Sequence, residues 1–272
     1  MKLAYVIYTY DRIHDALVQM EIIRHLWAKK FTKVEIIHVY NGNPEWYEGK
    51  TIEDHFLRTK NLGHFEWAAN LIDIGVEHAI NIDCDYVVVS AADTWMMDVD
   101  LIYSKINQLK SENRVLLTCP WWNPELHNPQ DVWFATDFFI FDTKWERKNK
   151  MFPLKYGEFK EKYLDLLRYL WKWNAMVERV FFSRYLSACS NETNEVSLKA
   201  YSLRKLLMFN ERIPVHYTAD WHRTHELPHI WLYMSHSLES KRKMLNDKNV
   251  KLGKYTQMLK DGEYIDPTWY LM

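Results

Sequence analysis

The fold of this chain is decided by Tyr86-Val87-Val88-Val89-Ser90, a mostly apolar run that ends at Ala91-Ala92-Asp93. Such a continuous, β-branched run suits a strand buried on both faces of a mostly parallel sheet. In open α/β sheets, ligands bind just beyond the carboxyl ends of such strands. We therefore expect Asp93 to bring a carboxylate to a ligand-binding crevice, where it can hold a cation or a ligand hydroxyl. The alternative is that Asp93 caps the next helix.

Strand-like and helical patterns alternate around this run. Leu3–Tyr8 and Val34–Tyr40 are apolar runs of strand length, and Ile13–Lys29 between them has apolar residues at helical spacing. A strand–helix–strand unit of this kind builds a parallel sheet with a right-handed crossover. The fold class is therefore α/β, with a Rossmann-like, mostly parallel sheet flanked by helices. Further predicted elements are the helices Phe65–Ile80 and Asp98–Leu109 and the short strands Arg114–Thr118 and Phe138–Phe141.

The second half of the chain is predicted to be helical and rich in Trp. Glu158–Ser187 contains neither Gly nor Pro and has apolar residues at helical spacing, which indicates one long helix or two broken near Asn174. The segment from Glu239 onward is Lys-rich and helical in pattern. We expect this tail to be a solvated terminal helix; the alternative is that its basic face contacts a membrane surface.

Composition limits the classes of partner. The formal net charge of −1 provides no bulk attraction for nucleic acid or anionic membranes. The three cysteines lack metal-type spacing, which is typical of reduced thiols in an intracellular protein. The N-terminal apolar run is too short for a signal peptide or a membrane span. We therefore expect a soluble cytoplasmic protein without a nucleic-acid partner.

Two adjacent indoles, Trp121 and Trp122, lie in the Pro-rich stretch Cys119–Pro129. The prolines disfavour regular structure there, so we expect a loop. Aromatic faces in such a loop can form a wall or lid for an acceptor sugar. Most of the other aromatic residues are expected to fill the core.

Four short motifs occur in order along the first hundred residues: Thr9-Tyr10-Asp11-Arg12, Val39-Tyr40-Asn41-Gly42-Asn43, Asn61-Leu62-Gly63 and Val89-Ser90-Ala91-Ala92-Asp93. Their order and spacing resemble the nucleotide-sugar half of family-2 glycosyltransferases of the GT-A fold. The resemblance implies a nucleoside-diphosphate sugar as donor and a carbohydrate or other hydroxyl-bearing molecule as acceptor. It also implies a nucleotide pocket lined by Thr9, Tyr10, Asp11, Arg12, Tyr40 and Asn61.

The resemblance also implies a divalent cation, but the metal motif is degenerate. Asp93 stands where the family binds Mn²⁺ or Mg²⁺, which bridges the two donor phosphates. Ala91 stands where the family has the first Asp of its Asp-x-Asp motif, and Tyr40 replaces the strand-end Asp that contacts the base. One carboxylate binds a cation more weakly, or a cationic side chain takes the ion's place. Tyr40 could stack on a base.

The family's Glu-Asp pair and following Arg correspond to Val177-Glu178 and Arg184. The resemblance implies that Glu178 is the catalytic base of an inverting transfer, and a desolvated carboxylate has the raised proton affinity that suits this role. The alternative is a solvated Glu paired with a neighbouring cation. Asp137, a lone acid entering an apolar strand, is the rival base.

The segment Asp220-Trp221-His222-Arg223 provides two further candidates. The resemblance implies a late His as an additional metal ligand, a role for which His216, His222 or His225 could serve, and Arg223 could bind phosphate through its planar guanidinium. The histidines around it lack the spacing of a helical zinc motif, so a hydrolytic zinc site is not predicted.

We therefore predict a glycosyltransferase with one GT-A-like domain over 1–237 and a helical tail over 238–272. The nucleotide-sugar half spans 1–100 and the acceptor half 101–237. The alternative is a catalytically silent module that binds a sugar or nucleotide, because Ala91, Tyr40 and Val177 are losses that such a module would show. A nucleotidyltransferase is a poor fit, since the turn after the first strand contains no Gly.

Overall fold

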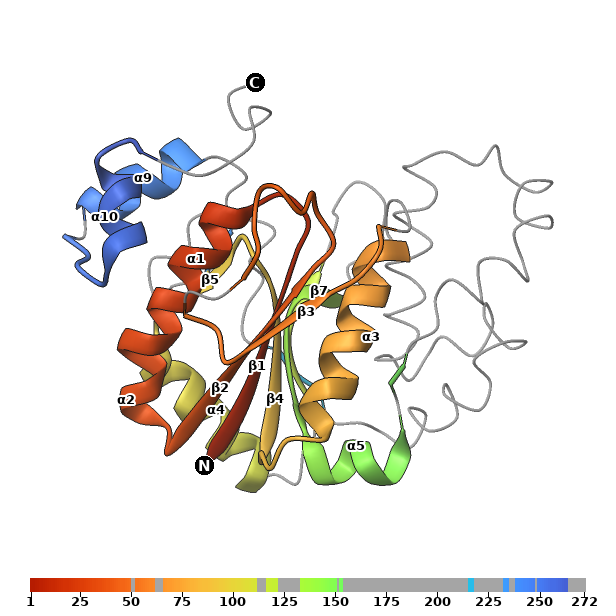
Figure 1. Cartoon of the computed structure of the whole chain (residues 1–272). Coiled ribbons are helices and arrows are strands. Elements are labelled where there is room, and N and C mark those ends of the chain that lie inside the picture. The colour runs from red at the N-terminus through yellow and green to blue at the C-terminus, as the bar shows by residue number, and fades with distance from the viewer. Residues whose placement is uncertain are drawn as a thin grey trace, which may run out of the picture.

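The computed structural model describes residues 1–49, 52–61, 66–111, 116–121, 133–150, 152–153, 215–217, 232–234, 238–247 and 249–263. Within these ranges the chain forms an α/β structure in which helices cover both faces of a mostly parallel sheet (Figure 1). The predicted fold class is therefore confirmed. The Glu158–Ser187 helix lies outside the described residues.

The main sheet of the described residues has seven strands in the order β3-β2-β1-β4-β7-β6-β8. β7 runs antiparallel to both of its neighbours, and the other strand pairs are parallel. A separate antiparallel pair joins β5 to β9. The strands are β1 (Lys2–Thr9), β2 (Lys33–Tyr40), β3 (His55–Arg58), β4 (Tyr86–Ala91), β5 (Thr94–Met96), β6 (Leu116–Trp121), β7 (Trp133–Asp142), β8 (Val215–Tyr217) and β9 (Leu232–Met234).

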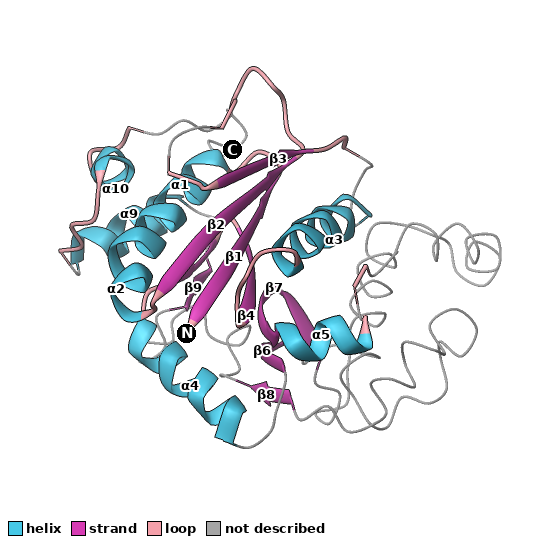
Figure 2. Cartoon of the chain, turned by 60° about the horizontal axis from the view of Figure 1, so that its bottom comes forward, coloured by secondary structure: helices cyan, strands magenta, loops and turns pink. Residues whose placement is uncertain are grey.

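Two helical layers cover the sheet (Figure 2). Leu3, Tyr5 and Ile7 of β1 pack in one apolar cluster with α1 and α4, whereas Val6 and Tyr8 face a second cluster built with α3. Burial on both faces explains why the strands are continuous apolar runs. The helices are α1 (Ile13–Ile22), η1 (Ile23–Trp27, a π-helical turn), α2 (Ala28–Lys30), α3 (Glu66–Ile80), α4 (Val99–Ser111), α5 (Thr143–Asn149), α9 (Leu238–Asp247) and α10 (Lys254–Lys260).

Asp93 does not cap the next helix. After β4 the chain forms β5, and α4 begins only at Val99. Asp98 is the capping residue, because its Oδ1 accepts a hydrogen bond of 2.9 Å from the Leu101 amide. The helix-cap interpretation of Asp93 is therefore wrong, and its carboxylate is used elsewhere.

The prediction of a loop over Cys119–Pro129 is wrong for its first three residues, which belong to β6. β6 continues through Trp121, which pairs with Trp133. The pairing register shifts between Thr118 and Pro120, as expected where proline cannot donate to the sheet. Trp121 is thus the last residue of a strand, and Trp122 lies outside the described residues.

The described C-terminal residues are helical, as predicted, but the expected solvated terminal helix is wrong. Leu245 of α9 and Leu259 of α10 are fully buried in the apolar cluster that also contains α1. Met244 is buried in the same cluster, so these apolar side chains are not available to a membrane surface. Over the described ranges, no helix combines the length and apolar character that crossing a bilayer requires.

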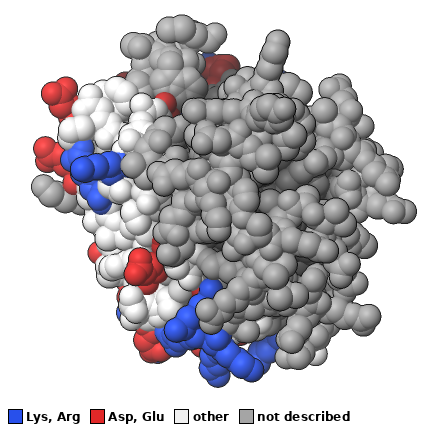
Figure 3. Space-filling view, turned by 90° about the vertical axis from the view of Figure 1, so that its right-hand side faces the viewer, with Lys and Arg blue, Asp and Glu red and all other residues white. Residues whose placement is uncertain are grey.

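Basic side chains gather along the lower edge of the face shown in Figure 3. α5, which contains Lys144, Arg147 and Lys148, lies at the bottom right of the molecule in Figure 1. Arg147 donates at 2.8 Å to the carbonyl oxygen of Ile80, the last residue of α3, and at 3.2 Å to that of Ile82 in the turn that follows. Cationic groups commonly bond these last helical carbonyls, so Arg147 secures α5 against α3.

Candidate functional site

The carboxyl ends of three parallel strands bring three of the four predicted motifs together. Thr9 at the end of β1 pairs with Tyr40 at the end of β2, and Tyr8 pairs with Ala91 at the end of β4. Backbone hydrogen bonds of 3.2 Å continue this edge beyond the strands, from Asn41 N to Thr9 O and from Ala92 N to Tyr8 O. We call Thr9, Arg12, Asn41 and Asp93 the strand-end site.

Asp93 forms an ion pair with Arg12. The Arg12 Nη1–Asp93 Oδ2 distance is 2.5 Å, and each side chain is 11% exposed, so the pair reaches the surface only at its rim. Arg12 Nε lies 3.0 Å from Asp15 Oδ2, and the Asp15 side chain is fully buried. The structure therefore joins two predicted site residues, Arg12 and Asp93, to a carboxylate on the first turn of α1.

A second cation, Lys241 of α9, reaches this cluster. The Lys241 ammonium is fully buried, pairs with the Asp15 carboxylate and donates to the Asp93 carbonyl oxygen at 2.8 Å. It also lies 4.3 Å from the centroid of the Trp95 ring. Burial lowers the pKa of Lys241, and the Asp15 charge opposes that change. Arg12, Lys241, Asp15 and Asp93 thus form a group of two cations and two anions.

The charge cluster does not fit a divalent cation on Asp93. The carboxylate already holds Arg12, and the Lys241 ammonium lies against the backbone of the same residue. Two unit charges 4 Å apart interact by about 4 kcal/mol near a protein surface, so a divalent ion beside either cation would be repelled by about twice that. Within the described residues, no group of three or more His, Cys, Asp or Glu side chains is arranged to hold a metal ion.

Buried polar atoms without partners lie at the ends of β1 and β2. Thr9 is 2% exposed and Asn41 is 4% exposed. Thr9 Oγ1 and both Asn41 amide atoms find no hydrogen-bond partner among the described residues. An unsatisfied buried polar group costs about 1–3 kcal/mol, and most such groups in native proteins have a partner. These three atoms are therefore candidates for hydrogen bonds with a ligand at the sheet edge.

Tyr40 is fully buried, and its ring packs against His38, Tyr47 and Phe56 at centroid distances of 6.0 to 6.2 Å. Its hydroxyl donates to the Asn43 carbonyl oxygen at 2.8 Å, and burial raises its pKa to about 12. A base stacked on this ring would require the aromatic cluster to open. The base-stacking role stays a prediction that this conformation does not display.

The turn after Tyr40 approaches the turn after β1 closely. A Cβ on Gly42 would lie 1.8 Å from the Tyr10 carbonyl oxygen. Only glycine allows this contact, so Gly42 fixes the two turns side by side. The Tyr10 ring packs against Trp67, 5.9 Å between centroids.

The remaining predicted site residues differ in how far they lie from the strand-end site, and some lie outside the described residues. Asp11 is half-buried in the turn after β1, and Asn61 is exposed. Asp137 is in β7, one position before Phe138, which pairs with Ser90 near the end of β4. The backbone of Asp137 therefore lies beside the strand-end site. Glu178, His222 and Arg223 lie outside the described residues.

A buried polar group supports the turn that carries Asp93. Gln19 Nε2 donates to Ser90 Oγ at 2.7 Å and to the Thr94 carbonyl oxygen at 2.6 Å. Trp95 Nε1 donates to the Asp15 carbonyl oxygen at 3.1 Å. These bonds tie α1 to the turn between β4 and β5. Sequence reasoning missed Gln19; its only local signal is a polar residue inside an apolar helical pattern.

Sequence reasoning also missed Asp15 and Lys241. The i, i+3 spacing of Arg12 and Asp15 is a local signal for their pair. Lys241 has no local signal, because it lies 226 positions from Asp15 and 148 from Asp93.

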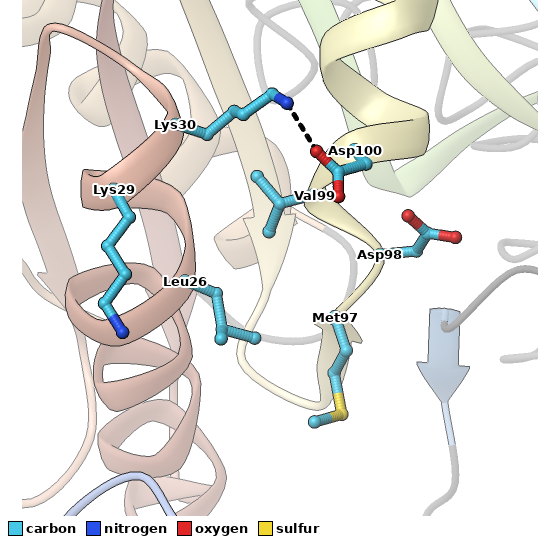
Figure 4. A pocket seen from close by; sticks show the side chains of 7 residues that line it. All are labelled: Leu26, Lys29, Lys30, Met97, Asp98, Val99 and Asp100. Carbon is cyan, nitrogen blue, oxygen red and sulfur yellow. Dashed lines mark ion pairs between the residues drawn. The ribbon is translucent and has the colours of Figure 1, made fainter.

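A hollow of about 450 Å³ lies away from this edge, between α2 and the start of α4 (Figure 4). Lys30 and Asp100 form an ion pair of 2.5 Å there, and both side chains are well exposed. The hollow is open and carries both charge signs. Its lining residues are Leu26, Lys29, Lys30, Met97, Asp98, Val99 and Asp100.

No family model matches the sequence, and neither does any curated protein. Among solved structures, S. aureus TarS 1-349 is similar with a TM-score of 0.39 and 12% identity, over 56% of this chain and 50% of that one. A197 from STIV is similar with a TM-score of 0.34 and 9% identity, over 54% of this chain and 68% of that one. S. aureus TarS matches with a TM-score of 0.38 and 11% identity, over 56% of this chain and 30% of that one. The similarity thus spans half the length of the TarS 1-349 chain, and at these scores it establishes neither a family nor an activity.

Proposed function

We propose that this chain is a glycosyltransferase that moves a sugar from a nucleoside-diphosphate donor to an acceptor hydroxyl. The observation that carries the proposal is a set of buried atoms, Thr9 Oγ1 and the Asn41 amide, which have no hydrogen-bond partner in the described part of the chain and lie beside the Arg12–Asp93 pair. They lie where open α/β sheets bind their ligands. The ordered motifs that resemble family-2 glycosyltransferases include these residues.

The strand-end site offers complementary chemistry to such a donor. The Thr9 hydroxyl and the Asn41 amide can exchange hydrogen bonds with a base or ribose. The positive end of α1, which begins at Ile13, and the Arg12 guanidinium suit the oxygens of a diphosphate. Favourable groups for both parts of a nucleoside diphosphate thus occur at one edge.

In the proposed inverting reaction, the acceptor oxygen attacks the anomeric carbon, a base removes its proton, and the nucleoside diphosphate leaves. Asp137 and Glu178 are the proposed bases. The backbone of Asp137 lies beside the end of β4, which favours Asp137. In this proposal Trp121, Trp122 and Arg223 contact the acceptor or the phosphates, in the roles that the sequence predicts.

The proposal is tested by assaying purified protein for donor turnover with a panel of nucleotide sugars and simple sugar acceptors. We expect one donor to be consumed, with Asp137→Asn or Glu178→Gln reducing turnover by at least about a hundredfold. Turnover that survives both substitutions would remove the assigned bases.

The second candidate is a silent module that binds the nucleotide or sugar without reaction. The occupation of Asp93 by Arg12, together with Ala91 and Tyr40 at family positions, favours it. Binding of a nucleotide without turnover of any donor would select this candidate, whereas transfer would exclude it.

A further inference from the structure

We propose that the donor diphosphate is bound here without a divalent cation, by the Arg12 guanidinium that Asp93 and Asp15 hold in place. The inference rests on the proposed function, and it assigns Asp93 a positioning role in place of the metal-binding role that the resemblance implies.

The first step of the argument is the fixed position of Arg12. Its Nη1 lies 2.5 Å from Asp93 Oδ2 and its Nε lies 3.0 Å from Asp15 Oδ2. Two carboxylates from different elements therefore orient one planar guanidinium. A guanidinium held in this way is pre-organised to bind phosphate oxygens, because little side-chain entropy is lost when they arrive.

The second step is the loss of cation ligands. The family pattern places two carboxylates two positions apart, and here the first is Ala91, which is 7% exposed and cannot bind an ion. The remaining carboxylate, Asp93, has Arg12 as its partner. A lone carboxylate shared with a guanidinium is a poor ligand for Mg²⁺ or Mn²⁺, which need several oxygen ligands.

The third step is the contribution of Lys241. Its ammonium donates to the Asp93 carbonyl oxygen and pairs with Asp15, so a second positive charge lies next to the position a metal would take. Both cations are fixed by the fold, one from the turn after β1 and one from α9. Because Asp15 and Asp93 balance both charges, Arg12 offers the diphosphate N–H donors in a fixed position and not the net positive charge of a metal.

The first experiment measures Mn²⁺ binding to the full chain without nucleotide, from the electron paramagnetic resonance signal of free Mn²⁺. Wild type and Asp93→Asn are expected to bind the same amount. One equivalent of Mn²⁺ bound by wild type and lost in Asp93→Asn would overturn the inference. This comparison holds whether or not the chain binds nucleotides.

The second experiment needs no variant and measures the Kd of UDP, GDP and ADP for wild type in EDTA and in excess Mn²⁺. The inference predicts Kd values that agree within about threefold, whereas tightening of about tenfold or more with Mn²⁺ would overturn it. If none of the three binds under either condition, the proposed function fails, whereas a metal site on Asp93 overturns only the inference, so the two failures are distinguishable.

The third experiment separates the diphosphate from the rest of the ligand. Arg12→Gln is expected to weaken nucleoside-diphosphate binding by about tenfold or more and to leave binding of the matching nucleoside unchanged. Arg242→Gln, which removes an arginine that pairs with Glu239 on α9, is the matched control and should change neither. Restoration of the Arg12→Gln affinity by Mn²⁺ would overturn the inference.

Discussion

Lys241 donates a hydrogen bond of 2.8 Å to the carbonyl oxygen of Asp93, from a position 148 residues further along the chain. The contact makes α9 part of the strand-end site, because the same ammonium pairs with the buried Asp15 carboxylate. α10 is also fixed to α1, since the Glu21 carboxylate on α1 accepts hydrogen bonds from the amides of Tyr255 and Thr256 at 2.7 and 2.8 Å. The C-terminal helices therefore stabilise α1 and the turns on which the site is built.

Replacing Lys241 by Met should lower the free energy of unfolding strongly. Asp15 would lose a buried partner, and breaking a buried ion pair on one side costs about 3–5 kcal/mol. Urea denaturation of the full chain measures the change. Lys243→Met, at an exposed position on the same helix, is the control and should cost little. Equal stabilities of the two variants would show that the buried pair contributes nothing.

Thr9→Val should separate ligand binding from stability. Thr9 Oγ1 is buried and has no partner among the residues that the structure describes, so its removal should leave the free energy of unfolding unchanged or raise it by about 1 kcal/mol. Nucleotide affinity should fall, because the hydroxyl would be lost to the ligand. Thr256→Val is the contrasting variant: its Oγ1 donates to Glu21 at 2.6 Å, so we expect a loss of stability of about 1–3 kcal/mol. A destabilised Thr9→Val protein would mean that the hydroxyl already has a partner.

His38 should make the fold sensitive to acid. Burial among Tyr40, Tyr47 and Phe56 lowers its pKa from 6.5 to about 4, with Glu53 opposing the change. Because the unfolded chain takes up this proton first, the contribution of neutral His38 is complete above pH 6.5 and is lost as the pH falls toward 4. The loss approaches roughly 3 kcal/mol.

The measurement is the pH dependence of the unfolding free energy for wild type and His38→Leu. The difference between the two proteins reports His38 together with Glu53, whose carboxylate interacts with it. We expect the wild type to lose stability relative to the variant between pH 6.5 and 4. Parallel curves over this range would contradict the assignment.

The elements that bury both faces could be predicted from the sequence. β1, β2 and β4 are continuous apolar runs, and the helices follow helical periodicity, so starts and ends fall within a few residues of the expected positions for α3, for α4 and for the continuous stretch from α1 through η1 to α2. β3 could not be found in this way, because its four residues are half-buried or exposed and carry no regular alternation. β6 extended past its predicted end, since a bulge accommodates Pro120.

The site was predictable only in part. The strand-end positions of Thr9, Asn41 and Asp93 follow from the parallel sheet, in which strand ends meet at one edge. A cationic side chain in place of the ion was one of the options, but its identity as Arg12 depends on how the turns after β1 and β4 approach each other. The contact of Lys241 depends on where α9 packs, and no local pattern contains that information.

Isothermal titration calorimetry of the full chain with UDP, GDP and ADP decides whether the strand ends bind a nucleoside diphosphate. We expect at least one of the three to bind at a single site in EDTA, with a Kd about tenfold weaker in both Thr9→Val and Arg12→Gln. A nucleotide that binds equally well to both variants, or no binding by a folded wild-type protein, would show that the donor site is not at these strand ends.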